Sequence, residues 1–446
     1  IGPALVGRPC SITVYDVEGK PAANVKVFLN GAEIGLTGAD GVLTTDALKE
    51  LAAGTEFVVT ASSELGLSFE AKGTILSLAG NDNALPTSIR HDIVSDPTTE
   101  RTISWFTNPQ YARAKAYVRY MTKEHYDSLK RGLGPDSDYM TLRGDCAALP
   151  FSTSKNAAYV NTVSLTGLTP ATTYVYWVGD GSEEGWSEMQ SFTTEAAEKP
   201  EKTSFYILGD TQMTGVAEND AEAISYLNAI LKAADEHGVD FGLQTGDFID
   251  NGANYVHYQQ ILDLLQASPV GSKYLIHALG NHEYYGNLDG ETTKAAFNLP
   301  SNDFYSVEYG RVYVAVINNT ADFKEASAWL KEDAAKTACD WKVVMFHEPA
   351  YFTNPNDGTS AKYQDSLVPA MEEAGIDVVL SGHDHSYART EPLKGGKVDK
   401  ANGLSYFICG DLGEKSRNLN YKAVDNEDFH FAYLTQEYDA LYMLAD

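Results

Sequence analysis

The sequence is poor in cysteine, in basic residues and in long apolar runs. Its 446 residues include four cysteines, whose wide spacing fits neither a zinc ribbon nor a dense disulfide framework. Lysine and arginine number 33 against 62 acidic residues, so the net charge of −29 disfavours nucleic acid and anionic membranes as partners. No run reaches the roughly 18 apolar residues of a membrane span. The sequence therefore predicts a soluble globular chain with room for about three domains.

Three segments with different residue patterns follow one another along the chain. Residues 1–82 and 83–196 contain short alternating or β-branched runs between turn residues, such as "VKVFLNG" and "TYVYWVGD", and predict two β-sandwiches. From residue 203 onward, strands alternate with amphipathic helices, for example over 221–236, where apolar residues recur at helical spacing. The predicted fold class is multidomain, with two all-β sandwiches followed by an α/β domain over 203–446.

Polar motifs follow the predicted strands of the third segment. In chain order they are "ILGDTQ", "LQTGDFID", "HALGNHE", "VVMFHEP" and "VVLSGHDH". Because ligands bind at the carboxyl ends of strands in open α/β sheets, we expect these strand ends to meet at one site. Two imidazoles on either side of one Asp, directly after a strand, indicate a metal site rather than an ordinary surface loop.

The order GD, GDxxD, GNHE, isolated His and GHxH resembles the signature of the calcineurin-like metallophosphoesterases. Residues 168–174, "LTPATTY", resemble the fibronectin type III pattern, and the first segment resembles prealbumin-like or Ig-like modules. A fibronectin-like segment before the phosphoesterase motifs makes the chain most similar to the purple acid phosphatases. The resemblance implies a four-layer α/β/β/α domain with a binuclear centre of divalent or mixed-valence ions, Fe, Mn or Zn.

Ligand roles follow from the resemblance, motif by motif. The residues that would hold the first metal are Asp210, Gln212 and His385. Those that would hold the second are Asn281, His347 and His383. Asp247 would bridge the two metals, and Gln212, a neutral amide where many members have histidine, is the weakest ligand of the set. Purple acid phosphatases carry a ligand tyrosine three residues after the bridging Asp; Asp250 stands there, which predicts a centre without the purple chromophore.

Phosphate ester hydrolysis is the reaction that this site implies. Two divalent ions against the carboxylates of Asp210 and Asp247 leave the site near +2, which creates an anion site within an acidic protein. A metal-bound hydroxide would be the nucleophile and His282 the general acid, with Asp250 stabilising its protonated form. Phosphate monoesters of small molecules are the expected substrates. A phosphodiesterase or nucleotide pyrophosphatase activity, and a non-catalytic surface binding protein, remain alternatives.

The remaining expectations concern location and neighbouring side chains. A start at Ile1 rather than Met indicates a trimmed N-terminus with any signal peptide removed, and two β-sandwiches in front favour an extracellular or cell-surface bacterial protein. Histidines outside the motifs are interpreted as structural or surface residues, with His277 the closest case. Tyr284 and Tyr285, directly after GNHE, either line the substrate site or pack at the loop base. Arg417 is a candidate phosphate contact.

Overall fold

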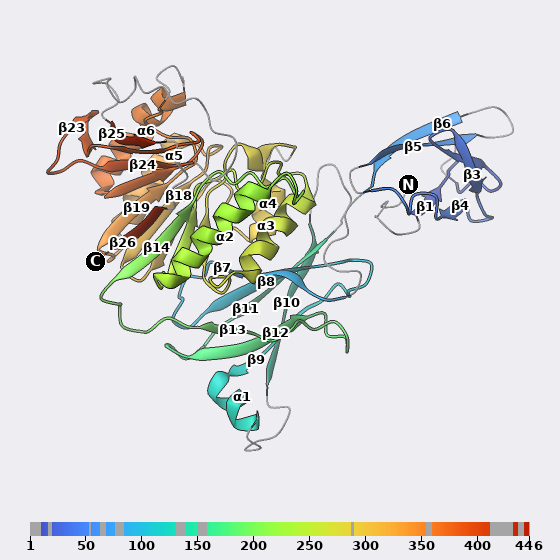
Figure 1. Ribbon diagram of the computed structural model, residues 1–446, viewed down its shortest axis with the longest axis horizontal. Helices are drawn as coiled ribbons and strands as arrows, with labels where there is room; N and C mark the ends of the chain where they lie inside the picture. Colours follow the sequence, from blue (N-terminus) through green and yellow to red (C-terminus); the bar gives the residue numbers. More distant parts are fainter. Residues whose placement is uncertain are drawn as a thin grey trace.

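A computed structural model describes residues 10–16, 20–52, 55–62, 68–75, 84–130, 139–149, 158–286, 290–353, 359–410, 431–435 and 441–445. Within these ranges the chain forms two all-β units followed by an α/β domain, as the sequence predicts (Figure 1). All four cysteines fall in the described ranges, and no disulfide joins them. No helix in the described part of the chain has the length and apolarity needed to cross a membrane.

The first unit consists of two small antiparallel sheets. One pairs β1 with β4, and the other has the order β3-β2-β5-β6. Alternate residues of β2 and β5, including Val27, Phe57 and Val59, are buried between the sheets. The strands of this unit are β1 (Cys10–Thr13), β2 (Lys26–Leu29), β3 (Ala32–Leu36), β4 (Val42–Thr45), β5 (Glu56–Ser62) and β6 (Ser68–Thr74).

The second unit is one folded-over antiparallel sheet in the order β13-β12-β9-β10-β11-β8-β7. Strand β10 pairs with β9 through residues 140–144 and with β11 through 145–148, so it links the two halves. The Tyr174 hydroxyl accepts a hydrogen bond from the N–H of Thr169 at 2.9 Å, the corner expected from "LTPATTY". The elements are β7 (Thr87–Asp92), β8 (Arg101–Thr107), β9 (Ala116–Thr122), α1 (Lys123–Lys130), β10 (Met140–Ala148), β11 (Tyr159–Leu165), β12 (Thr173–Gly179) and β13 (Gln190–Thr193).

The α/β domain contains two stacked mixed sheets. Their orders are β16-β15-β14-β26 and β17-β18-β19-β20-β24-β21-β25, with parallel pairing from β14 to β16 and from β18 through β20 to β24. A two-stranded ribbon, β22 with β23, lies beyond them. The strands are β14 (Thr203–Leu208), β15 (Phe241–Gln244), β16 (Leu275–His277), β17 (Phe304–Tyr309), β18 (Val312–Ile317), β19 (Trp341–Met345), β20 (Val378–Ser381), β21 (Tyr387–Thr390), β22 (Leu393–Lys394), β23 (Lys397–Val398), β24 (Ser405–Cys409), β25 (Phe431–Thr435) and β26 (Leu441–Ala445).

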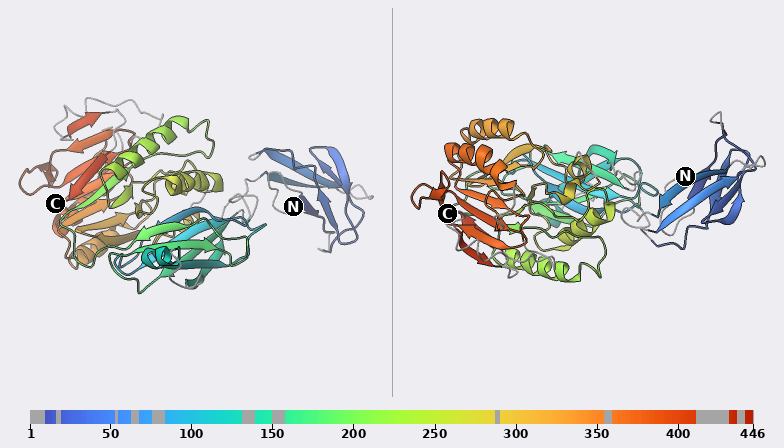
Figure 2. Two further views of the ribbon diagram at one scale, coloured as in Figure 1. Left: turned by 60° about the horizontal axis from the view of Figure 1, so that its bottom comes forward. Right: turned by 90° about the horizontal axis from the view of Figure 1, so that it is seen from above.

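Helices cover the outer faces of both sheets, which gives four layers. In the right-hand view of Figure 2 the orange helices lie on one side of the sheets and the green helix on the other. The core between the sheets joins Phe205 and Leu243 of the first to Val314 and Met345 of the second. The predicted α/β/β/α arrangement is confirmed. The helices are α2 (Ala221–Glu236), α3 (Tyr255–Ala267), the short η1 (His282–Tyr284), α4 (Glu291–Phe297), α5 (Phe323–Ala334) and α6 (Thr359–Ala374).

Hydrogen bonds attach the second β unit to the α/β domain. Asp263 of α3 accepts from the Ser88 hydroxyl at 2.7 Å, and Gln266 accepts from the Ile89 N–H at 2.7 Å. Asn298, just after α4, donates to the buried carboxylate of Asp92 at 3.1 Å. Strand β7 thus lies against α3 and α4, and packs beside the first sheet of the α/β domain.

Candidate metal centre

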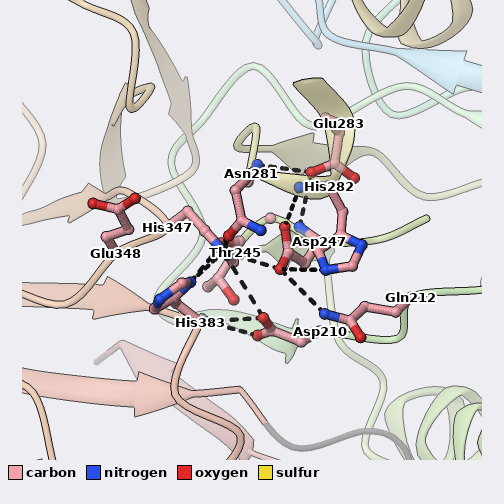
Figure 3. A network of polar contacts seen from close by, with 12 residues as sticks. Asp210, Gln212, Thr245, Asp247, Asn281, His282, Glu283, His347, Glu348 and His383 are labelled. Atoms are coloured by element: carbon pink, nitrogen blue, oxygen red, sulfur yellow. Dashed lines mark hydrogen bonds and ion pairs between the residues drawn. The ribbon is translucent and has the colours of Figure 1, made fainter. Parts of the chain in front are cut away.

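The seven predicted ligands come from five strand ends and lie in one cluster. Asp210 and Gln212 follow β14, Asp247 follows β15, and Asn281 follows β16. His347 comes after β19, and the two histidines of "GHDH" after β20. In Figure 3 Asp247 lies in the middle, among Asp210, Gln212, Asn281 and His347. Parallel pairing brings together the ends of β14, β15 and β16 in one sheet and those of β19 and β20 in the other, and the stacking of the two sheets brings the two groups together.

The three residues predicted for the second metal face one another. Asn281 Oδ1 lies 3.1 Å from His347 Nε2 and 3.0 Å from His383 Nδ1. The two imidazole nitrogens are 3.3 Å apart. Ligand atoms of Asp247, His347 and His383 all lie within 4.8 Å of one another. This spacing gathers carboxylate, amide and imidazole donors around one point, as a borderline divalent ion requires.

The residues predicted for the first metal gather on the other side of Asp247. His385 Nε2 lies 3.9 Å from Asp210 Oδ1 and 3.3 Å from Gln212 Nε2. Gln212 Nε2 is also 3.2 Å from Asp247 Oδ2, and that same oxygen lies 3.2 Å from His347 Nε2. Asp247 therefore contacts a member of each group through one carboxylate oxygen.

The surroundings of His347 favour a positive charge within the cluster. Its Nδ1 lies 2.9 Å from the Thr245 carbonyl and donates to it, so a neutral ring turns the lone pair of Nε2 toward the oxygens of Asp247 and Asn281. Facing lone pairs repel unless a cation or a proton lies between them. Burial lowers the pKa of His347, but the carboxylates of Asp247 and Asp210 outweigh it and raise the pKa to about 10. A divalent cation bound at this point would supply the same positive charge.

Gln212 adds a second sign that the residues fit a metal. Its Oε1 is buried and has no hydrogen-bond partner among the described residues. The amide nitrogen faces Asp247 and His385, and a half-turn of the amide about its last bond would bring the oxygen there instead. An orphaned buried acceptor costs about 1–3 kcal/mol, which a bound cation removes.

Glycines let the ligands approach this closely. A Cβ on Gly246, whose φ is +99°, would lie 2.5 Å from His347 Nδ1. One on Gly280 would lie 2.2 Å from Asp247 Oδ1, much closer than real Cβ contacts. The glycines of the GD and GN motifs therefore leave room for the metal ligands, rather than only shaping the turns.

His282 and Asp250 lie beside the cluster. The His282 N–H donates to Asp247 Oδ1 at 2.8 Å, and its Nε2 lies 3.8 Å from Asp247 Oδ2. Its Nδ1 is 2.8 Å from the backbone carbonyl of Asp250 but 3.7 Å from the carboxylate Oδ1 of that residue. The expected pairing is present, although the main chain of Asp250 provides the hydrogen bond and the carboxylate adds only a nearby charge.

Sequence reasoning missed two buried acids within the ligand motifs. Glu283 of "GNHE" is fully buried, and its carboxylate accepts from the N–H groups of Asp247, Phe248 and Gly280 at 2.8, 2.8 and 2.7 Å and of Ile249 at 3.3 Å. Asp384 of "GHDH" accepts from the N–H and the hydroxyl of Thr353, both at 2.7 Å. The available signal was the place of these two acids inside the ligand motifs, at positions without an assigned ligand role.

Histidines outside the motifs have structural surroundings. His277 is buried and stacks on Phe297 at a ring-centroid distance of 4.2 Å. His257 accepts from the N–H of Asn251 at 3.1 Å, and His91 bonds the Tyr176 hydroxyl at 3.1 Å. Within the described part of the chain, the hydrogen bonds of His91 and His257 go to residues outside the predicted ligand set. Arg417 lies outside the described residues.

Comparison with known proteins matches two segments of this chain to family models. Residues 203–387 match the family model described as calcineurin-like phosphoesterase, and residues 86–194 match that of the purple acid phosphatase N-terminal domain. The chain carries a calcineurin-like phosphoesterase domain behind a purple acid phosphatase N-terminal domain. The resemblance inferred from the motifs is confirmed, and the metal-ligand motifs all lie within the first match.

Curated relatives include purple acid phosphatases, and a solved structure shares the fold. Purple acid phosphatase 15 of Arabidopsis thaliana is 26% identical over 297 residues, which cover 58% of this chain and 54% of that protein. The probable inactive purple acid phosphatase 27 of the same plant is 23% identical over 340 residues, covering 66% of this chain and 54% of that protein. The chain thus spans about half the length of these relatives. The purple acid phosphatase PPD1 from yellow lupin (Lupinus luteus) seeds matches 100% of this chain and 85% of its own at a TM-score of 0.65 and 16% identity, a likeness of fold.

Proposed function

We propose that this chain hydrolyses phosphate monoesters of small molecules at a binuclear metal centre. The observation that carries the proposal is the place of Asp247, whose Oδ2 lies 3.2 Å from His347 Nε2 on one side and 3.2 Å from Gln212 Nε2 on the other. A carboxylate in that place can serve two cations at once. The full set of proposed ligands is Asp210, Gln212, Asp247, Asn281, His347, His383 and His385.

Two bound divalent cations would supply Lewis acidity and an activated water for in-line attack on phosphorus. The chain contributes the charge of the site. Only Asp210 and Asp247 bring formal negative charge to the proposed ligand set, and the amides and imidazoles bring none. The ligand shell therefore stays short of neutralising two divalent ions, and the site attracts a phosphoryl anion although the chain has a net charge of −29.

His282 would act as the general acid. Its Nδ1–H donates to the Asp250 carbonyl at 2.8 Å, so the proton available for transfer sits on Nε2, which points toward the site near Asp247. The Asp250 carboxylate lies 3.7 Å from Nδ1 and places a negative charge beside the ring. From this position His282 can give its proton to the departing alkoxide, a contribution worth about 10² to 10⁴ in rate.

The test combines metal analysis with turnover. We expect about two metal equivalents per chain, and hydrolysis of p-nitrophenyl phosphate in preference to bis-p-nitrophenyl phosphate. His282→Ala should lose about 10²- to 10⁴-fold on an alkyl phosphate while it keeps its metals. Asp247→Ala should lose metal as well, whereas His237→Ala, at an exposed site, should match the wild type.

Several outcomes would contradict the proposal. A strong preference for the diester would point to a phosphodiesterase or nucleotide pyrophosphatase on the same site. Absence of turnover in a fully metallated protein would favour a non-catalytic binding protein, and the name of one relative, a probable inactive purple acid phosphatase, keeps that alternative in view. Because Asp250 replaces the ligand tyrosine, we also expect no purple absorption band with iron. We propose an extracellular or cell-surface location, with support from the two β-sandwich units alone.

A further inference from the structure

Tyr285 contacts two residues of the proposed centre from its outer side. Its ring lies 4.6 Å from the imidazole of His282, centroid to centroid, at an interplanar angle of 47°. Its hydroxyl accepts a hydrogen bond from Asn281 Nδ2 at 3.1 Å. The side chain nevertheless remains 48% exposed, unusual for a tyrosine beside a largely buried cluster. A large apolar surface is therefore left open next to the proposed general acid.

The hydroxyl of Tyr285 determines which end of the Asn281 amide faces His347 and His383, the residues that would hold the second metal. Because Nδ2 donates to Tyr285, Oδ1 is turned toward His347 and His383, at 3.1 and 3.0 Å. An amide without this bond can present its nitrogen, which is not a ligand atom. Partners of this kind orient a ligand and typically change metal affinity about 10- to 100-fold when they are removed.

The ring of Tyr285 lies where the leaving group must go. His282 protonates the oxygen that leaves phosphorus, so the group attached to that oxygen lies on the same side of the centre as His282. Tyr285 is the exposed ring in contact with that imidazole. A planar aromatic group can stack on such a ring, and an aliphatic group of the same size gains only the contact of its surface.

We propose that Tyr285 determines leaving-group specificity and favours phosphate monoesters with an aromatic alcohol portion, while its hydroxyl positions Asn281. This inference rests on the proposed function. Aromatic pairing, beyond the burial of surface area, multiplies the intrinsic preference for an aryl over a matched aliphatic ester by about 2- to 12-fold. The two roles belong to different atoms of one side chain, so different substitutions separate them.

The experiment compares Tyr285→Phe with Tyr285→Leu. Both lack the hydroxyl, and only the first keeps the ring. With phenyl phosphate and cyclohexyl phosphate as substrates, the ratio of the two kcat/KM values should stay at the wild-type level in Tyr285→Phe and fall about 2- to 12-fold in Tyr285→Leu. Both variants should bind the metals more weakly, by about 10-fold or more in a chelator competition, because Asn281 has lost its partner.

A binding measurement without turnover completes the test. Phenylphosphonate should bind the wild type and Tyr285→Phe more tightly than methylphosphonate does, by calorimetry, and Tyr285→Leu should lose most of that difference. An unchanged phenyl to cyclohexyl ratio in Tyr285→Leu would overturn the ring's role, even with full activity present. Unchanged metal affinity in Tyr285→Phe would overturn the positioning role. If the metallated wild type hydrolyses neither ester, the proposed function itself fails, and this outcome differs from the other two.

Discussion

Replacing Glu283, which is not itself a proposed ligand, with glutamine should destabilise the α/β domain. The carboxylate is fully buried, and each of its oxygens accepts two backbone N–H groups. Oε2 accepts from Asp247 and Gly280, and Oε1 from Phe248 and Ile249. Glutamine has the same shape but offers only one acceptor oxygen. Whichever way the amide turns, two buried N–H groups lose their partner and face an NH₂ group.

The cost follows from the number of donors left unsatisfied. A buried polar group without a partner costs about 1–3 kcal/mol, so two such groups predict a loss of about 2–6 kcal/mol. That is a large part of the stability of a typical domain, which is about 5–15 kcal/mol. The loss should appear in chelator-treated protein as well as in metallated protein, because these hydrogen bonds join protein groups only.

Urea unfolding followed by intrinsic fluorescence measures the change. Glu236→Gln is the matched control, because its carboxylate is 65% exposed and lies 3.7 Å from Lys232, a surface pair worth less than about 1 kcal/mol. We expect the control to unfold like the wild type. A loss below about 1 kcal/mol in Glu283→Gln, or one seen only with metal bound, would refute the reasoning.

Two further predictions concern a glycine and a histidine. Gly246→Ala should lose metal binding, because its Cβ would lie 2.5 Å from His347 Nδ1. The control Gly238→Ala, where φ is +67° and no atom lies within 4 Å of the added Cβ, should keep the metals and lose only about 1–2 kcal/mol of stability. Metal analysis and urea unfolding of both variants check this. Burial lowers the pKa of His277 to about 3, so between pH 6.5 and 3 the unfolded chain binds a proton that the folded chain excludes. As the pH is lowered through this range, the free energy of unfolding therefore falls by up to about 1.4 kcal/mol per pH unit. That slope should diminish in His277→Leu and persist in His237→Leu, and equal slopes in both variants would show the assignment to be wrong.

The order of elements was predictable because periodicity fixes helices and strands locally. The helix expected over 221–236 is α2, and its buried residues Ala223, Leu227, Ile230 and Leu231 repeat at helical spacing. The gathering of the proposed ligands within each sheet was also predictable, because parallel strands end at one edge and each motif follows such a strand. Neither inference needs the positions of side chains. The stacking of the two sheets, which joins the two groups of ligands, was expected only from the resemblance.

The contacts that the sequence could not predict depend on main-chain groups and on segments that lie far apart in the chain. The partner of His282 is the Asp250 carbonyl rather than the carboxylate, and a carbonyl has no sequence signature. The four N–H groups that donate to Glu283 belong to residues 247–249 and to Gly280, which lie 31 to 33 residues apart, and no local pattern links them. Docking of β7 on α3 through Asp263 and Gln266 likewise depends on how two domains pack.

Strain in the ligand loops shows how the site is held. Gln212, Asp247 and His383 have φ of 43°, 52° and 66°, the left-handed region that costs a non-glycine residue about 1–2 kcal/mol. Each of them is tied by a main-chain hydrogen bond to another part of the centre.

The Gln212 N–H donates to the Asp247 carbonyl at 2.9 Å, and the Asp247 N–H to Glu283 at 2.8 Å. The His383 N–H donates to the Asp210 carboxylate at 2.9 Å. Because these bonds join protein groups only, they offset the strain before any metal binds. The protein itself therefore brings the proposed ligands together, and binding of the ions does not have to fold the loops.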